Sequence, residues 1–187
     1  MPIYKAPVED FTFLFNDVFQ IDRYDNLPGF SDASADVRDA ILQEAAKFSE
    51  QVLQPLNHTG DLEGCTRHDD GRVTTPKGFK DAFKQLSEGG WLGLSGPQEF
   101  GGQGLPVTLS QSVNEFMISA NMAFSMYGGL TMGAMAALLV HGSDEQKKTF
   151  VPRMMTGEWS GTMNLTEPHC GTDLGLMRTK AVKQAEG

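Results

Sequence analysis

Apolar residues recur every three or four positions in several segments between residues 36 and 151 of this 187-residue chain, and near Trp159 the period changes to two. The longer period is typical of helices with one face turned to a core, and the shorter one is typical of strands. The sequence therefore predicts a helical domain followed by a β region. The firmest helix is expected over 36–56. Its apolar positions are Val37, Ile41, Ala45, Phe48, Val52 and Leu56.

Proline and glycine predict the boundaries of the next helix. Residues 57–75 show no periodicity and are expected to form a loop. Thr75 is expected to cap a helix whose first turn holds Pro76 and which ends at Gly89-Gly90. The following stretch, 91–106, combines five glycines with apolar residues, which indicates an ordered apolar loop in which glycine permits close packing.

Two helices that are apolar on almost all sides are expected over 108–126 and 130–140, separated by Gly128-Gly129. Such helices are typical of the centre of a bundle. Five of the ten methionines lie in them, and these side chains could either fill the core or line an adaptable apolar pocket.

A capping box and a proline bound the last expected helix. Ser143 and Gln146 have the spacing at which each side chain satisfies a free backbone donor at a helix start. Pro152 removes an internal hydrogen bond and crowds the preceding turn, so the helix is expected to kink or end near Val151.

Period-two patterns over 159–165 and 177–183 predict two strands. A pair of strands alone is marginal in water and leaves its apolar face and edges open, which indicates a fragment of a longer protein. We expect an N-terminal extension over 1–35 with at most one short helix, a helical domain over 36–158, and an incomplete β domain over 159–187.

Composition excludes several functional classes. The chain has 15 Lys and Arg against 24 Asp and Glu, a net charge of −9, so nucleic acid is not an expected partner. Glu9 and Asp10 interrupt any secretory signal, and the most apolar stretch, 128–140, is too short to span a membrane. Cys65 and Cys170 do not make a disulfide framework, so a cytoplasmic location is expected.

The histidines and cysteines raise the question of a metal site. Cys65 lies three residues before His68, and His169 is next to Cys170. The paired short spacings of structural zinc sites are absent, and adjacent loop side chains rarely reach one tetrahedral ion. We therefore expect ordinary loop residues and free thiols, with no metal site and no cysteine nucleophile.

The segment 163–174 is the most informative one, because an expected strand ends there in a polar loop. Strand-end amides, a threonine hydroxyl and a glycine that permits close approach are groups that a planar heteroaromatic or a phosphate ligand would use. Glu167 within it is either a general base or the acceptor of a turn.

This segment carries a motif of a known family. Residues 166–173 read T-E-P-H-C-G-T-D and match the T-E-P-x-x-G-[ST]-D motif of the flavin-dependent acyl-CoA dehydrogenases. Residues 97–105 are similar to the family's P-E-[YF]-G-G-x-G-L loop with one additional residue, and 142–158 are similar to its stretch joining helical domain and sheet. The resemblance covers about 36–187 and is greatest to the bacterial subgroup that includes 3-methylmercaptopropionyl-CoA dehydrogenase.

The resemblance implies a mainly α fold, in which an N-terminal helical bundle of the acyl-CoA dehydrogenase type precedes the first strands of a β domain. It implies FAD as cofactor, with Leu165 and Thr166 near the flavin ring, Gly171 and Thr172 near a phosphate, and Thr172 also near the acyl-CoA. The FAD-contacting residues that it implies are Met163, Asn164, Leu165, Thr166, Gly171 and Thr172.

The resemblance also implies an activity: α,β-dehydrogenation of an acyl-CoA to a trans-2-enoyl-CoA, with hydride transfer to FAD. The catalytic carboxylate of the family belongs to a C-terminal helical domain that this sequence does not include, so no catalytic residue is assigned and the fragment alone is expected to be inactive. An electron-transfer flavoprotein as acceptor and a homo-oligomer are further expectations. Two alternatives remain: a non-catalytic acyl-CoA-binding, flavin-binding or assembly module, and an oxidase.

Overall fold

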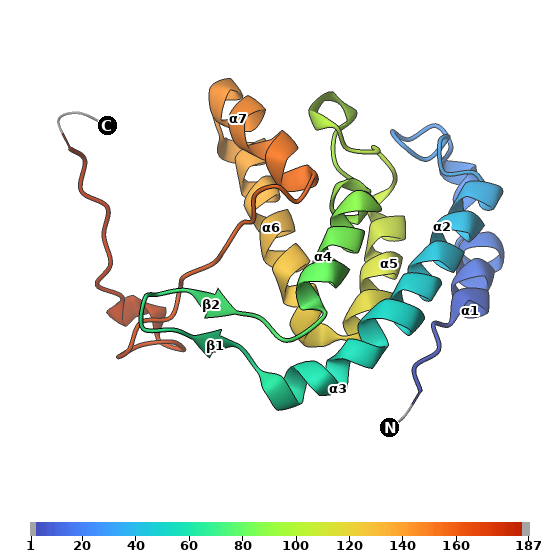
Figure 1. Ribbon diagram of the computed structural model, residues 1–187. Coiled ribbons are helices and arrows are strands. Elements are labelled where there is room, and N and C mark those ends of the chain that lie inside the picture. The colour runs from blue at the N-terminus through green and yellow to red at the C-terminus, as the bar shows by residue number, and fades with distance from the viewer. Residues whose placement is uncertain (1–2, 185–187) are drawn as a thin grey trace.

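The computed structural model describes residues 3–184, which form a helical bundle and a C-terminal segment that leaves it (Figure 1). The helices are α1 Val8–Phe13, α2 Ala35–Phe48, α3 Gln54–Glu63, α4 Phe79–Glu88, α5 Val107–Ala120, α6 Met122–His141 and α7 Asp144–Met155. Turns of π type lie at Leu14–Val18 and Ser49–Leu53, and 3-10 turns at Ile21–Tyr24, Trp91–Gly93, Gln98–Phe100 and Leu174–Leu176. The mainly α fold is confirmed.

The helix expected over 36–56 is confirmed and is longer than predicted. The helical path continues from α2 through the π turn into α3 and ends at Glu63, so the prediction of a loop from residue 57 was wrong for its first part. Strands β1, Thr66–Arg67, and β2, Val73–Thr74, then pair antiparallel. The intervening chain turns because the Asp70 carboxylate accepts hydrogen bonds from the backbone and side chain of Arg72.

The predicted Thr75 cap was wrong. Helix α4 begins at Phe79, because the Phe79 amide bonds the carbonyl of Pro76 and Gly78 takes a left-handed conformation with φ of +88°. A side chain at Gly78 would also meet Leu56, with its Cβ 2.6 Å from a Leu56 methyl carbon. The expected end at Gly89-Gly90 is confirmed.

Asn121, and not Gly128-Gly129, separates the two long apolar helices. Its backbone is extended, its side chain accepts from the Phe124 amide at 3.0 Å, and its Nδ2 donates to the Leu53 carbonyl at 3.1 Å. Both glycines lie inside α6, and Gly128 packs closely on Leu92, where a Cβ would lie 3.2 Å from a methyl carbon. A buried polar side chain with both groups bonded thus ends one helix and begins the next.

Helix α7 shows both hydrogen bonds of the expected capping box. The Ser143 hydroxyl accepts from the Gln146 amide at 3.2 Å, and the Gln146 side chain accepts from the Ser143 amide at 2.9 Å. A kink or an end was expected near Val151, and the helix does not end there, because it includes Pro152 and reaches Met155. Val151 and Met155 are both buried in a small cluster with Met135 of α6, and this packing holds the last turn.

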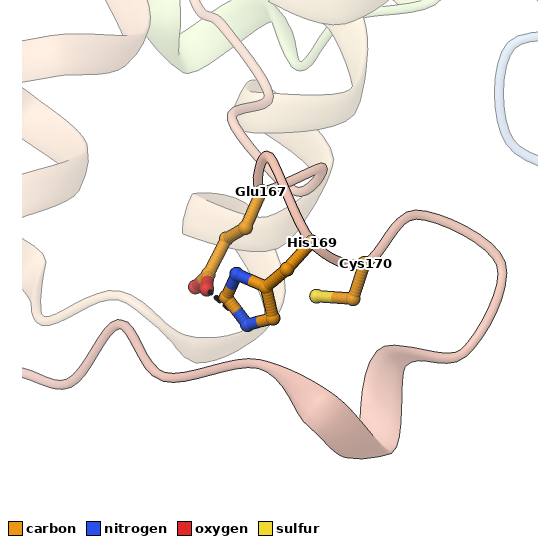
Figure 2. A group of neighbouring side chains, drawn as sticks. All are labelled: Glu167, His169 and Cys170. Atoms are coloured by element: carbon orange, nitrogen blue, oxygen red, sulfur yellow. Dashed lines mark ion pairs between the residues drawn. The ribbon is translucent and has the colours of Figure 1, made fainter.

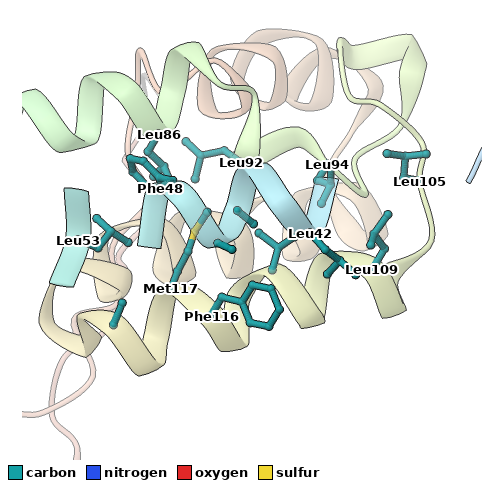
Figure 3. Packing of buried hydrophobic residues seen from close by; sticks show 14 of the residues in the cluster. Leu42, Phe48, Leu53, Leu86, Leu92, Leu94, Leu105, Leu109, Phe116 and Met117 are labelled. Atoms are coloured by element: carbon teal, nitrogen blue, oxygen red, sulfur yellow. The ribbon is translucent and has the colours of Figure 1, made fainter. Parts of the chain in front are cut away.

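The main core lies between α2, α4, α5 and the loop 91–106 (Figure 3). Figure 3 shows Leu42 of α2 and Leu109 and Phe116 of α5 among its members. The loop is ordered, as expected: Gln103, Gly104 and Leu105 donate backbone hydrogen bonds to Gly93, Gly96 and Leu94. Leu92, Leu94 and Leu105 are buried, so this loop is part of the core.

The N-terminal extension contains one short α-helix, as expected, and is bound closely to the bundle. Arg38 of α2 is 2% exposed, and its guanidinium donates to Asp22 at 2.7 Å, to the Ala33 carbonyl at 2.7 Å and to Asn16 at 2.9 Å. Gly29, with φ of +80°, packs so closely on Gly104 that a Cβ would lie 2.1 Å from the Gly104 carbonyl oxygen.

Helix α6 is 20 residues long and, by length and composition, apolar enough to cross a membrane. The apolar stretch 128–140, on which the expectation of no membrane span was based, is shorter than this helix, because the helix begins directly after Asn121. Only 22% of its most apolar window is buried, and α5 buries seven of its 14 residues, so neither helix is covered on all sides as expected for the centre of a bundle. Met122, Met126 and Val140 are exposed, so α6 presents an uncovered apolar face.

The strands expected over 159–165 and 177–183 were wrong for this structure. Neither segment forms a ladder, and in the part of the chain that is described the only pairing beyond β1 and β2 is an isolated bridge between Glu167 and Cys170. An alternating pattern predicts which face a strand would bury, but a strand forms only beside a partner strand. No partner strand lies beside either segment among residues 3–184.

Candidate functional site

The segment that follows α7 is fixed to the bundle before it reaches the motif. The Trp159 amide donates to the Arg153 carbonyl at 3.0 Å, and the Arg153 guanidinium lies 4.4 Å from the centre of the Trp159 ring. Two residues later, the Gly161 amide donates to the Thr131 hydroxyl at 3.1 Å. A Cβ on Gly161 would lie 2.5 Å from the Ala134 side chain, so glycine permits this approach to α6.

The motif itself forms a tight turn. Glu167 and Cys170 exchange backbone hydrogen bonds of 2.8 and 3.1 Å, and the Cys170 side chain is buried. The Glu167 carboxylate accepts from the amides of Arg178 at 3.1 Å and Thr179 at 2.8 Å. Of the two roles open for Glu167, the structure supports the turn acceptor, because its oxygens already hold the chain that follows.

Glu167, His169 and Cys170 lie together, with their ligand atoms within 4.8 Å of one another (Figure 2). The turn brings these three side chains to one side, a proximity that the sequence spacing did not indicate. The His169 Nε2 lies 3.0 Å from the Leu176 carbonyl oxygen and 3.4 Å from the Glu167 carboxylate. These contacts connect the two ends of the loop 167–178.

The pKa of Glu167 is lowered from its ordinary value by hydrogen bonds from Thr179 and then from the Arg178 amide, both of which favour the carboxylate. A lowered pKa means that the interaction is complete above the ordinary glutamate pKa and is lost as the pH falls through the folded value.

Acidification is therefore expected to release residues 178–179 from Glu167. Amide chemical shifts of Arg178 and Thr179, followed by NMR, should titrate with a midpoint below the ordinary glutamate pKa. The variant Glu167→Gln keeps an acceptor oxygen and should abolish this titration. A midpoint at or above the ordinary value would contradict the assignment.

The predicted FAD-contacting residues all lie on the exposed surface of this segment. Met163 is 64% exposed and Leu165 is 38% exposed, although both are apolar. Among residues 3–184, Thr166 and Thr172 take part in no hydrogen bond, and Asn164 bonds only Thr162. The structure thus brings the six residues into one stretch and leaves their polar groups available. Their contacts with a ligand remain a prediction.

The segment fits a flavin nucleotide in its chemistry. Free hydroxyls and amides next to exposed apolar side chains suit a flat ring system with polar edges. A Cβ on Gly171 would lie 3.3 Å from the Thr166 methyl carbon, so glycine leaves Thr166 room and keeps the backbone open to a phosphate.

Sequence reasoning missed the polar groups that position this segment. Thr131 is fully buried in an apolar helix, and its hydroxyl bonds the Tyr127 carbonyl and the Gly161 amide. A threonine of this kind is common in helices, so no local pattern marked it. The alternating pattern over 159–165 predicts a strand, whereas Gly161 lies close against α6.

A small cavity of about 90 Å³ lies between α5, α6 and the turn at Trp91–Gly93. It is lined by Met117 and Ile118 of α5, Gly129 and Met132 of α6, and Trp91. A Cβ at Gly129 would meet no atom within 4 Å, so the α6 side is open. The methionines therefore serve both expected roles: Met117 and Met135 are buried core residues, and Met132 lines a cavity.

Comparison with known proteins identifies the fold. Residues 36–158 match the model of the acyl-CoA dehydrogenase N-terminal domain. A 3-methylmercaptopropionyl-CoA dehydrogenase from Ruegeria pomeroyi is 41% identical over 98% of this chain and 31% of its own length. A mitochondrial isovaleryl-CoA dehydrogenase from Pongo abelii is 29% identical over 86% of this chain and 35% of its own length.

A solved structure supports the same fold. The electron transferring flavoprotein structure of Acidaminococcus fermentans contains a chain with a TM-score of 0.64 and 23% identity, matched over 79% of this chain and 36% of that chain. This chain spans about a third of the length of the curated relatives that it matches.

The relatives differ in length. Four relatives that match at least 88% of this chain are about 590–640 residues long, judging from the number of aligned residues and the share of each relative that they cover. Two isovaleryl-CoA dehydrogenases that match 77–86% of it are about 450–460 residues long. The family match, the helical fold and the motif loop agree, and this chain belongs to the acyl-CoA dehydrogenase family.

Proposed function

We propose that this chain is the N-terminal part of an FAD-dependent enzyme that introduces a trans double bond between the α and β carbons of an acyl-CoA thioester. The observation that carries the proposal is the motif loop, which is fixed to α6 through Gly161 and turns unpaired polar groups and exposed apolar side chains outward. Bound FAD would accept the β hydrogen as hydride, and a carboxylate outside this chain would accept the α proton.

The residues of this chain would bind and orient FAD and the acyl-CoA. Leu165 and the hydroxyl of Thr166 would contact the flavin ring, and Met163 and Asn164 would also contact FAD, with Asn164 held by Thr162. Gly171 and Thr172 would contact a phosphate, and Thr172 would also contact the acyl-CoA. The exposed apolar face of α6 and the cavity beside Met132 suit an acyl chain, and the rest of the enzyme would cover them. A cytoplasmic homo-oligomer that passes electrons to an electron-transfer flavoprotein completes the proposal.

Replacing Thr166 with Val in the full-length enzyme is expected to weaken flavin binding about fivefold to tenfold, because a hydrogen bond worth about 1 kcal/mol is lost. Flavin content after dialysis and the flavin absorption spectrum measure this. The matched control is Thr149→Val on the exposed surface of α7, which should leave both unchanged.

Unchanged flavin content in Thr166→Val would contradict the role of that hydroxyl. Flavin binding without formation of a trans-2-enoyl-CoA from any acyl-CoA would replace the proposal with a non-catalytic binding module.

A further inference from the structure

The loop 167–178 brings together three side chains of the kinds that bind metal ions. Glu167 offers a carboxylate oxygen, His169 an imidazole nitrogen and Cys170 a sulfur, and these atoms all lie within 4.8 Å of one another. Figure 2 shows the His169 ring between the other two groups. Sequence spacing alone argues against a shared ion, but the turn that pairs the backbones of Glu167 and Cys170 supplies the convergence.

The separation of two of these atoms already matches a metal site. The His169 Nε2 lies 3.4 Å from the Glu167 Oε2. A tetrahedral zinc ion with bonds of about 2.0–2.1 Å to nitrogen and oxygen holds two such ligands about 3.3–3.4 Å apart. The Cys170 sulfur would have to approach by at most about 1.3 Å, which a rotation about its Cα–Cβ bond can supply.

The Glu167 carboxylate can bind a metal ion without releasing the turn. Its Oε1 accepts from the amides of Arg178 and Thr179, and its Oε2 accepts from the Arg178 amide at 3.1 Å. Each carboxylate oxygen has two lone pairs, so Oε2 keeps one on the side of His169. The Glu167 side chain is 14% exposed and Cys170 is 8% exposed, which limits competition from water.

His169 would exchange one partner for the metal ion. In the metal-free protein its Nε2 lies 3.0 Å from the Leu176 carbonyl oxygen, and it must donate, because a carbonyl only accepts. For coordination the ring proton moves to Nδ1, and Nε2 presents its lone pair. Leu176 lies in an exposed 3-10 turn, so its carbonyl can give way. Metal binding and the contact between His169 and Leu176 therefore exclude each other.

We propose that Glu167, His169 and Cys170 form a zinc site with one position left for water. Carboxylate, imidazole and thiolate are the donors that zinc takes in proteins, whereas Mg²⁺ and Ca²⁺ need oxygen ligands. On binding, the Cys170 S–H bond breaks, a Zn–S bond forms and the proton passes to solvent. The proposal uses side chains of this chain alone and does not depend on the proposed function.

Calorimetric titration of the metal-free, full-length enzyme with zinc chloride tests the proposal. Compared with the parent, His169→Ala should bind one zinc ion per chain at least about 100-fold more weakly, and its exposed side chain can be removed without loss of packing. Cys170→Ser should show the same loss. The matched control is the exposed Cys65→Ser, which should bind zinc as the parent does. Equal zinc binding by the parent and His169→Ala would overturn the proposal.

X-ray absorption at the zinc edge identifies the ligands in the folded protein. In the Cys65→Ser variant loaded with one zinc ion per chain, we expect one sulfur at about 2.3 Å and nitrogen and oxygen at about 2.0–2.2 Å. A zinc ion without a sulfur ligand would overturn the proposal, and this measurement decides it even if Cys170→Ser, at a buried position, fails to fold. Flavin content of the same samples tests the proposed function separately.

Discussion

Replacing Gly102 with Ala is expected to lower the free energy of unfolding by about 4 kcal/mol, which is large for one methyl group. The added Cβ would lie 2.2 Å from the Gly96 carbonyl oxygen and 2.3 Å from its carbon. Both atoms are backbone and cannot rotate away, so the loop 91–106 must open. Opening breaks the bond from the Gly104 amide to Gly96 and draws Leu94 and Leu105 out of the core.

Urea unfolding followed by far-ultraviolet circular dichroism measures this effect. The control is Gly133→Ala on the exposed side of α6, where a Cβ would meet no atom within 4 Å. That variant should be as stable as the parent or more stable by up to about 1 kcal/mol, because alanine favours helix. A Gly102 variant within about 1 kcal/mol of the parent would show that the loop can adjust.

The second large effect is expected for Phe116→Ala, which should lower the free energy of unfolding by about 4 kcal/mol. The side chain is fully buried in the main core, and its ring supports Phe11 of the extension. Removing it leaves a cavity and deprives α1 of its main aromatic contact. The extension should therefore become sensitive to protease at concentrations that leave the parent intact.

The matched control for Phe116 is Val107→Ala, at a 61% exposed position of the same helix. This control variant should lower the free energy of unfolding by no more than about 0.5 kcal/mol. If the extension resists protease equally well in Phe116→Ala and in Val107→Ala, Phe116 has no special role in holding it.

The helices could be predicted because their signal is local and repeated. The spacing of apolar residues predicted α2, and the capping box predicted the start of α7, without knowledge of the fold. Gly128 misled the prediction, because glycine is usually a helix breaker, whereas here its missing side chain makes room for Leu92. Asn121 ends the helix instead, through a bond to Leu53 that lies 68 residues away in sequence.

The candidate site divides in the same way. The motif at 166–173 marked the loop, because its residue types are contiguous in sequence. The strands expected on either side require neighbours, and an alternating pattern carries no information about whether a neighbour is present. The hydrogen bond between the Gly161 amide and the Thr131 hydroxyl could not be predicted from the sequence. Nothing local to a threonine in an apolar helix indicates that it accepts from an amide 30 residues later.

The contact between Gly29 and Gly104 sets an order of events during synthesis. Gly104 leaves the ribosome 75 residues after Gly29, a delay of about 4–15 s at common elongation rates of about 5–20 residues per second. The Phe11 ring waits longer, because its partner Phe116 is made 105 residues after it. The last contacts of the extension therefore form only after the loop 91–106 and α5 have been made.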